Sequence, residues 1–342
     1  MVELNGKKIL VTFLMHLGDL TLTTPFIHAL RKAAPDAHIT MLVDEKLKDV
    51  VLFNPYLDEV VTIDKKGRDN SILSLWACSR HLSKLDFDVL INLHPNERCS
   101  FIDAMTSVKL RTGTTHKIFK WFWDVFTPLD RSMHAADMYL DVLHQLGVQD
   151  LSNNGLEIFP GEEHFLEAEL FWQEQNITAQ DKLIGFNIGS AVPTKRWPPE
   201  RFAEVADIFA AKGYKTVFFG GPMDEEMVAE ATGYMQTRPI IATGHFAIGG
   251  LAAAMRRCCL IITNDSGPMH VAISQKVPVV AMYGPSNPKL YGPYTKDAVI
   301  VTAQPPCQGC ADGMKHSCDD LQCMNRMTVE QVVKAADTML NK

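Results

Sequence analysis

The sequence lacks the features that mark membrane-spanning, secreted and nucleic-acid-binding proteins. It has no apolar run long enough to cross a bilayer, and its N-terminus lacks the apolar core of a signal peptide. Eight cysteines in 342 residues do not make a disulfide scaffold. The net charge of −7 argues against a general nucleic-acid binder. These absences predict a cytoplasmic globular protein, and 46% hydrophobic with 21% charged residues fits that class.

Strand patterns alternate with helical patterns along the whole chain. A buried strand at 7–13 is followed by a loop and a helical pattern over 20–34, and a second series begins with the strand at 182–188. The first loop has no GxGxxG sequence, so it is not a dinucleotide-binding fingerprint. The alternation predicts an α/β protein with parallel sheets covered by helices on both faces.

The length suggests two such domains. We expect the first over 1–150, and the polar, turn-prone stretch 150–155 opens a linker and connecting helix over 151–180. The second domain is expected over 181–327, with a last helix within 328–342. Open α/β sheets bind ligands at the carboxyl ends of their strands, so the two domains are expected to leave a cleft between facing strand ends.

The stretch 260–274, LIITNDSGPMHVAIS, combines a strand, a turn and a helix start. Pro268 suits the first helical position, and Gly267 lets a phosphate approach the backbone. Free N–H groups and partial positive charge gather at a helix start, which makes it an anion site. Asp265 ends the strand, and His270 could reach the same phosphate. A plain strand–helix turn capped by Asp265 fits the pattern equally well.

Two more side chains fit a site for a diphosphate. Lys195, on the loop after the second domain's first strand, would place a point charge on a phosphate, although such a lysine is more often surface. Asp19, on the other wall, could act as general base toward an acceptor hydroxyl, with capping as the alternative. No paired-carboxylate motif lies near these loops, so we expect no catalytic magnesium. A lysine and a helix dipole could stabilise a leaving diphosphate instead.

The first half holds two further candidates for binding. Basic residues in its loops and helix starts could bind an anionic acceptor, although solvated surface charge is the more common explanation. They are Lys65, Lys66, Arg68, Arg80, Arg98 and Arg111. The run 118–126, IFKWFWDVF, is dense in aromatic residues. We expect it to pack in the core, with an interfacial membrane contact as the alternative.

Taken together and in order, these loops resemble glycosyltransferase family 9, the bacterial heptosyltransferases of lipopolysaccharide core assembly. The resemblance is carried by GDL at 18–20, TP at 24–25, KRWP at 195–198, FGGP at 219–222, NDSGPMH at 264–270, YGP at 283–285 and the Pro306–Cys307 region. It implies a GT-B fold of two Rossmann-like domains facing across a cleft, with the last helix crossing back to the first domain. It also implies an inverting, metal-independent transfer from ADP-heptose that requires no cofactor.

The resemblance gives a role to each matching residue. Asp19 would be the catalytic base, Lys195 would hold the donor phosphate, and Asp265 would contact the sugar. The diphosphate would be cradled by Ser266, Gly267, Met269 and His270. The donor loops would add Ser190, Thr194, Asp224, Glu225, Thr243 and Phe246. The loop at 187–190 reads NIGS, without the proline–glycine–alanine opening common in the family.

The acceptor is less defined than the donor. A lipid-linked oligosaccharide would suit the scattered arginines, with Arg68, Arg98 and Arg111 as candidate contacts, and would suit a peripheral location at the inner face of the cytoplasmic membrane. Two other functions fit a two-domain nucleotide-binding protein. A nucleotide-sugar epimerase would need acid–base groups around the sugar ring and no acceptor, and a non-catalytic nucleotide-binding protein would leave Asp19 without a role.

Four cysteines crowd near the C-terminus. Cys307, Cys310, Cys318 and Cys323 could bind a structural zinc, since four thiolates complete a tetrahedral site. Their spacing is irregular for a zinc ribbon, and paired buried thiols or redox-dependent disulfides fit it equally well. A catalytic role is not expected, because the cluster follows the last donor loop.

Overall fold

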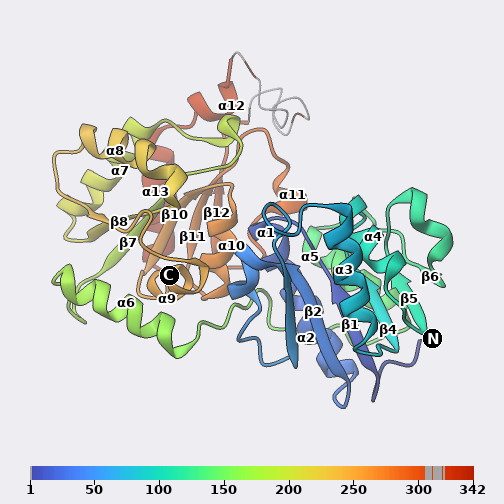
Figure 1. Ribbon diagram of the computed structural model, residues 1–342. Coiled ribbons are helices and arrows are strands. Elements are labelled where there is room, and N and C mark those ends of the chain that lie inside the picture. Colours follow the sequence, from blue (N-terminus) through green and yellow to red (C-terminus); the bar gives the residue numbers. More distant parts are fainter. Residues whose placement is uncertain (1, 305–309, 311–317, 319) are drawn as a thin grey trace. The chain divides into compact units, whose positions relative to one another are not determined.

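The computed structural model describes residues 2–304, 310, 318 and 320–342. The chain divides into two compact units, Met1–Phe159 and Pro160–Lys342, and each has its own parallel sheet (Figure 1). The residues just before the division belong to the first unit. The Glu157 N–H donates to Thr24 Oγ1 at 3.1 Å, and its carboxylate lies 3.0 Å from His28 Nδ1. The expected linker at 151–180 is therefore shared between the two units.

The first unit is built on a six-stranded sheet with the order β3-β2-β1-β4-β5-β6. Its strands are β1 (Lys8–Thr12), β2 (His38–Asp44), β3 (Glu59–Ile63), β4 (Val89–Asn92), β5 (Leu110–Gly113) and β6 (Val125–Phe126). β1 pairs in parallel with both β2 and β4, and Thr12 lies opposite Leu42 and Asn92. The loops that follow β1, β2 and β4 therefore leave the sheet at one edge.

Helices cover both faces of this sheet. They are α1 (Leu17–Thr21), α2 (Thr24–Ala33), α3 (Ile72–Ser83), α4 (Glu97–Met105) and α5 (Ala135–Gln145), with the 3₁₀ helices η1 (Glu45–Val50) and η2 (Lys117–Phe122). α3 and α4 pack together on the face that carries Leu10 and Leu90, and α2 contacts α5. The single helix expected over 20–34 is two helices, because Pro25 lacks the N–H needed to continue a helix and suits the start of α2.

The aromatic run 118–126 was expected to pack in the core, and only part of it does. Ile118, Trp121 and Phe122 are exposed in η2, whereas Trp123 is buried and donates its indole N–H to the Thr112 carbonyl at 3.0 Å. The run is therefore divided between core and surface. Aromatic composition alone predicted burial of the whole stretch, but the short 3₁₀ helix turns most of these side chains outward.

The second unit repeats the design with a six-stranded sheet ordered β12-β11-β10-β7-β8-β9. Its strands are β7 (Leu183–Asn187), β8 (Lys215–Phe219), β9 (Ile240–Ile241), β10 (Leu260–Asn264), β11 (Val279–Met282) and β12 (Ala298–Val301). β10 lies between β7 and β11, so its carboxyl end is next to theirs. The strand order reverses between β7 and β10, which is where a doubly wound sheet opens a crevice for a ligand.

The helices of the second unit also form two layers. They are α6 (Glu162–Glu174), α7 (Pro199–Ala211), α8 (Glu225–Tyr234), α9 (Ile248–Met255), α10 (Gly267–Ser274), α11 (Pro288–Tyr291), α12 (Gln322–Asn325) and α13 (Val329–Leu340), with η3 (Pro193–Lys195) and η4 (Pro222–Asp224). α6 packs on α9, and α7 packs on α8 and α13 (Figure 1).

The last helix differs from its expected position. α13 contacts α7, β10, β11 and β12, and its Val332, Ala336 and Met339 lie in the core of the second unit. Residues 328–342 therefore pack on the second sheet, whereas the resemblance implied docking on the first domain. The apolar face of α13 packs against β10, β11 and β12. Among the described residues, no helix is both long and apolar enough to cross a membrane.

Candidate functional site

The carboxyl edge of the second sheet brings several predicted residues together. Asp265 follows β10 directly, and its Oδ2 lies 2.7 Å from Lys195 Nζ. The two side chains are only 7% and 13% exposed. Asp265 Oδ2 also accepts a hydrogen bond from the Ser286 hydroxyl, on the loop after β11. One carboxylate therefore joins the loops that follow three neighbouring strands.

The loop after β7 is fixed by two asparagines that the sequence analysis did not identify. Asn187 Nδ2 donates to Ser266 Oγ at 2.9 Å, and Asn264 Nδ2 donates to the Ile188 carbonyl at 2.7 Å. Asn264 Oδ1 accepts from the Trp197 N–H at 3.1 Å. Each asparagine ends a buried strand, and a polar residue at that point of an apolar run is the signal that could have revealed them.

The predicted donor-loop residues Ser190 and Thr194 lie in the same place. Ser190 Oγ is 3.4 Å from the Asp265 carbonyl, and its own carbonyl accepts from Arg196 Nε at 2.9 Å. Both Ser190 and Thr194 are buried, and Thr194 lies within η3 beside Lys195. η3 thus presents Lys195 from a loop that hydrogen bonds to the Asp265 turn.

α10 begins at Gly267, with Ser266 as its N-cap and Pro268 in its first turn. A helix start of this kind presents backbone N–H groups and positive partial charge to an anion. The Met269 and His270 side chains are buried within the unit, and the Tyr283 hydroxyl lies 3.6 Å from Met269 Sδ. Both residues lie in the first turn of α10, directly after the Asp265 turn.

A second group of predicted residues lies at the ends of β7, β8 and β9. A Cβ atom on Gly189 would lie 2.1 Å from Asp224 Oδ1, and one on Gly220 would lie 2.9 Å from Asp224 Cβ. Glu225 Oε1 lies close to Gly244, where a Cβ would be 2.6 Å away. The side chains of Asp224 and Glu225 therefore fill the space beside these glycines. A larger residue at any of the three glycine positions would displace the carboxylates.

Thr243 and Phe246 follow β9 at the same edge. Thr243 Oγ1 donates to the Phe218 carbonyl at 3.2 Å. The Phe246 ring packs against Phe171 and His245, with centroids 5.0 Å and 4.6 Å away. Phe246 is therefore part of an aromatic cluster between the loop after β9 and α6.

In the first unit, Asp19 lies in the first turn of α1, after the end of β1. Its Oδ2 is 3.6 Å from His16 Nδ1. His94, on the loop after β4, lies within electrostatic range: burial lowers the pKa of His94 to about 4, and the Asp19 carboxylate opposes that shift. The His94 ring rests edge-on against Phe13, with centroids 5.9 Å apart. Asp19 therefore has a neutral imidazole nearby at neutral pH.

A buried ion pair holds the loop that carries Asp19. Lys65 Nζ lies 3.0 Å from Asp44 Oδ2 and donates to the carbonyls of Leu14 and Met15 at 3.1 Å and 3.0 Å. The Lys65 and Asp44 side chains are 14% and 7% exposed. Lys65 was predicted as one of several cations that could bind an anionic acceptor or, more commonly, lie on the solvated surface. It fixes the backbone just before Asp19 instead.

Below this edge, a buried carboxyl group joins β1 to β4. Asp103 Oδ2 accepts from Thr12 Oγ1 at 2.9 Å and from Asn92 Nδ2 at 2.6 Å. Burial raises the pKa of Asp103 to about 7, although these hydrogen bonds lower it in part. Asn92 Oδ1 in turn accepts from the His94 N–H at 2.7 Å. Asp103 thus connects, through Asn92, to the loop that carries His94.

The three arginines expected to bind an acceptor are engaged by the protein. Arg68 pairs with Glu45 at 2.9 Å and with Asp69 at 3.3 Å, but its side chain is two-thirds exposed. Arg98 donates to the Lys65 carbonyl and to Asn70, and Arg111 donates to the carbonyls of Asp103 and Thr106. Arg98 and Arg111 therefore fix loops of the first unit.

The cysteine cluster lies partly outside the described residues, which do not include Cys307. Cys318 is exposed and Cys310 is half-buried, whereas Cys323 is buried beside Gly284, where a Cβ would lie 3.1 Å from its Sγ. In the described part of the chain, no group of three histidine, cysteine, aspartate or glutamate side chains could hold a metal ion.

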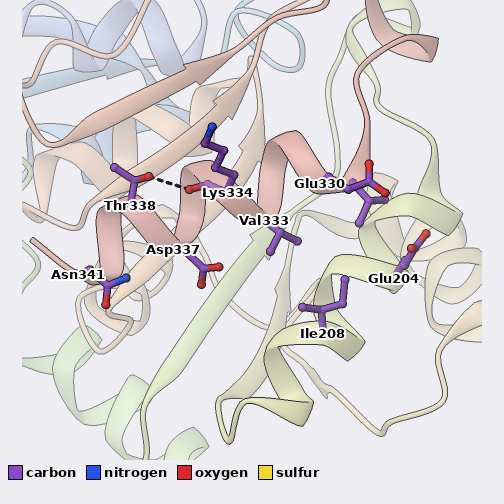
Figure 2. Close-up of a pocket in the computed structure, with 9 residues that line it drawn as sticks. Glu204, Ile208, Glu330, Val333, Lys334, Asp337, Thr338 and Asn341 are labelled. Carbon is purple, nitrogen blue, oxygen red and sulfur yellow. Dashed lines mark hydrogen bonds between the residues drawn. The ribbon is translucent and has the colours of Figure 1, made fainter.

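A groove of about 440 Å³ lies between α7 and α13 (Figure 2). It is lined by Glu204, Ile208, Val333, Asp337 and neighbouring residues of the two helices. Thr338 donates to the Lys334 carbonyl at 2.8 Å beside it. These residues come from the helical layer and not from the loops that carry Lys195 and Asp265, so the groove is separate from the candidate site.

Comparisons with known proteins bear on the family and the fold. The family model for glycosyltransferase family 9 (heptosyltransferase) matches residues 75–318. A crystal structure of a glycosyl transferase of family 9 from Veillonella parvula is 53% identical, covers 99% of both chains and gives a TM-score of 0.95. The lipopolysaccharide heptosyltransferase 3 of Escherichia coli is 24% identical over 297 residues, which are 82% of this chain and 84% of that protein.

Two solved structures at lower identity show the same fold. ADP-heptose lipopolysaccharide heptosyltransferase II of Escherichia coli is 21% identical and gives a TM-score of 0.81 over 98% of each chain. Escherichia coli heptosyltransferase WaaC with ADP is 16% identical and gives a TM-score of 0.74, over 97% of this chain and 99% of the other. The two parallel sheets described above are therefore those of a GT-B protein.

Proposed function

The chain belongs to glycosyltransferase family 9, and from that premise we propose that it transfers heptose from ADP-heptose to a lipopolysaccharide-core acceptor. As a member of this family it is a glycosyltransferase, which disfavours the epimerase and the non-catalytic alternatives. The observation that carries the proposal is the buried pair of Lys195 and Asp265 at the start of α10.

We propose that the second unit binds the donor. Lys195 and the N-terminus of α10 supply positive charge to the diphosphate, and the Asp265 carboxylate accepts hydrogen bonds from sugar hydroxyls. Asp265 is itself oriented by Ser286, so its position is fixed before the sugar binds. Asp224 and Glu225, which follow β8, are the proposed contacts of the ribose, and the loop at Thr243 and Phe246 is the proposed site of the base.

We propose that the first unit supplies the base. The acceptor hydroxyl oxygen attacks the anomeric carbon of the heptose while Asp19 takes the hydroxyl proton. The bond from that carbon to the phosphate oxygen breaks, and ADP leaves with the negative charge that Lys195 and the α10 start stabilise. A single in-line displacement inverts the anomeric carbon. The fixed positive charges make a divalent ion unnecessary, so activity should persist in a chelator.

The donor half is tested by calorimetric titration of the protein with ADP-, UDP- and GDP-sugars. Binding of ADP-heptose in preference to the others supports the proposal. Tighter binding of a UDP- or GDP-sugar contradicts the nucleotide assignment. The K195M variant should bind ADP-heptose at least about tenfold more weakly, because a charge-assisted contact to phosphate is lost.

The acceptor half is tested by transfer of labelled heptose to a deacylated lipopolysaccharide-core acceptor. Asp19→Asn should lower the turnover number by about 10²–10⁴-fold while ADP-heptose binding, measured by calorimetry, is unchanged. Glu3→Gln, a change of an exposed carboxylate, is the matched control and should have wild-type turnover. Wild-type turnover in D19N would show that another group takes the proton.

A further inference from the structure

Asp103 joins the carboxyl ends of the two central strands of the first sheet. It lies in α4, and the side chains of Asp103, Thr12 and Asn92 are all fully buried. Thr12 and Asn92 are the last residues of β1 and β4, and they lie opposite each other in the sheet. Both donate to the same carboxylate oxygen, Asp103 Oδ2, at 2.9 Å and 2.6 Å. One oxygen atom therefore fixes the point at which each strand passes into its loop.

The two loops that leave these strands carry Asp19 and His94. The loop after β1 leads to Asp19, in the first turn of α1. The loop after β4 carries His94, whose N–H donates to Asn92 Oδ1 at 2.7 Å. The Leu93 N–H donates to the Thr12 carbonyl at 3.2 Å, so the first residue after β4 is also held by β1. A change at the buried carboxylate would therefore reach both loops.

We propose that Asp103 is a positioning residue for the transfer reaction, and that it sets the places of Asp19 and His94 through the ends of β1 and β4. The inference rests on the proposed function, and it assigns a role to a residue that is fully buried and so touches neither donor nor acceptor. A base must lie within hydrogen-bond reach of the proton that it removes, and a displacement of about 1 Å can cost about 10²-fold in rate. A buried carboxylate suits this role, because water does not compete for its hydrogen bonds.

The strength of this contact depends on the charge of Asp103. Burial raises the pKa of the Asp103 carboxyl to about 7, and its hydrogen bonds lower that pKa in part. The titratable and charged groups that face it are Cys99 on α4, Cys78 on α3 and Arg111 on β5. Burial raises the pKa of Cys78 to about 11 and that of Cys99 well above its usual value, so both thiols stay protonated at neutral pH. Asp103 is therefore the group of this cluster that changes charge near neutral pH, and its ionised form makes the stronger hydrogen bonds.

The first measurement is backbone hydrogen exchange followed by mass spectrometry, which needs neither donor nor acceptor. D103L removes the oxygen that accepts both hydrogen bonds, so peptides covering 13–19 and 93–96 should exchange at least about tenfold faster. The matched control is D88L. Asp88 lies just before β4, and its Oδ2 accepts from the Lys8 N–H at 2.9 Å, so it joins the same two strands at their amino ends. D88L should leave exchange over 13–19 and 93–96 unchanged.

The second measurement is transfer of labelled heptose to the soluble core acceptor. D103L should lower the turnover number by about 10²-fold, because Thr12 and Asn92 lose the oxygen that orders the two loops. Donor affinity, measured by calorimetry, should stay at the wild-type value, since the proposed donor site lies in the second unit. T12V/D103L should be no slower than D103L, because both changes break the same contact. D88L should have wild-type turnover at a temperature where circular dichroism shows that every variant is folded.

The pH profile separates positioning from a loss of stability. In D103N the amide oxygen can still accept from Thr12 and Asn92, so this variant resembles the neutral form of the wild type. Wild-type turnover should rise between about pH 6 and about pH 8 as Asp103 ionises. D103N should be about tenfold slower than the wild type at the higher pH and within about threefold of it at the lower pH. H16Q removes the imidazole that lies 3.6 Å from Asp19, and the rise should persist in that variant.

Several results would overturn the proposal. It fails if the two loops exchange alike in D103L and the wild type, or if D103L has wild-type turnover. It also fails if D103L and D88L lose turnover equally, or if D103N keeps the full rise with pH. A wild type that binds ADP-heptose but transfers no heptose would count against the proposed acceptor, and the exchange measurement would still decide whether Asp103 holds the two loops.

Discussion

Lys195 and Asp265 form a buried ion pair between two loops of the second unit, with Nζ and Oδ2 2.7 Å apart. Lys195 comes from η3, after β7, and Asp265 comes directly after β10. The pair therefore joins the two loops at the point where the strand order of the sheet reverses. The two charges stabilise the fold by pairing with each other. In the proposed function they also contact the donor.

The first prediction concerns the stability that this pair provides. K195M leaves the Asp265 carboxylate buried without its cation, so the free energy of unfolding should fall by about 3 kcal/mol. K195M/D265N should recover most of the loss, because no buried charge remains unpaired. The matched control is K212M, which breaks the half-exposed pair of Lys212 and Asp337 and should cost less than about 1 kcal/mol. Urea unfolding of the four proteins measures these differences, and equal losses in K195M and K212M would contradict the argument.

The second prediction concerns Lys65, which we infer positions the Asp19 loop. K65M removes the partner of Asp44 and the donor to the Leu14 and Met15 carbonyls. Turnover with a soluble acceptor should fall about tenfold or more, because a small displacement of a catalytic group is costly. Donor affinity should stay at the wild-type value, since the change is confined to the first unit.

Two variants separate positioning by Lys65 from a general effect of charge. Lys48 is exposed in η1 and is not a candidate for acceptor binding, and K48M should have wild-type turnover. K65R keeps the charge and should recover part of the turnover. A K65M protein with normal turnover but reduced stability would show that the ion pair serves folding alone.

The third prediction concerns the glycine that makes room for Asp224. In G189A the new Cβ would lie 2.1 Å from Asp224 Oδ1, so the aspartate must leave its position over the end of β7. Donor affinity should fall about tenfold if Asp224 contacts the ribose, since one good polar contact is lost. G233A is the control, because a Cβ there has no atom within 4 Å and lies within α8. It should raise the free energy of unfolding by about 1 kcal/mol and leave calorimetric binding unchanged.

The sequence predicted the meeting of residues in the second unit better than the contacts of the first unit. Lys195, Asp265 and Ser190 each follow a buried apolar strand, so their meeting at one edge could be expected from the alternation of strands and helices. The partners of Lys65 could not be expected in this way. Its contact with Asp44 and the loop before Asp19 depends on β2 lying between β1 and β3, and strand order is not encoded in the local pattern.

The local sequence pattern also did not predict which apolar side chains are buried and against which elements they pack. The stretch 118–126 has the composition of a core segment, but η2 lies outside the sheet and exposes Trp121. α13 has a strong apolar stripe, which predicts that the helix packs against a sheet but does not indicate which of the two sheets. The same stripe suits either domain, and the structure uses it against β10 to β12.

The last prediction is a pH dependence with two opposing contributions. Burial lowers the pKa of His94 to about 4 from an ordinary 6.5. As pH falls from 6.5 toward 4, the unfolded chain gains a proton that folded His94 does not bind, so the free energy of unfolding falls. Burial raises the pKa of Asp103 to about 7 from 3.8. As pH rises from 3.8 toward 7, unfolded Asp103 loses a proton that the folded chain keeps, so the free energy of unfolding falls in that direction.

Single variants separate the two contributions. Between about pH 7 and about pH 5, the stability of the wild type relative to H94Q should fall by about 2 kcal/mol, because H94Q no longer has the imidazole that charges on unfolding. Over the same range, the stability of the wild type relative to D103N should rise by a similar amount. Urea unfolding at the two pH values measures both differences. The same sign in both variants would contradict the assignment, since a buried base and a buried acid must respond to pH in opposite directions.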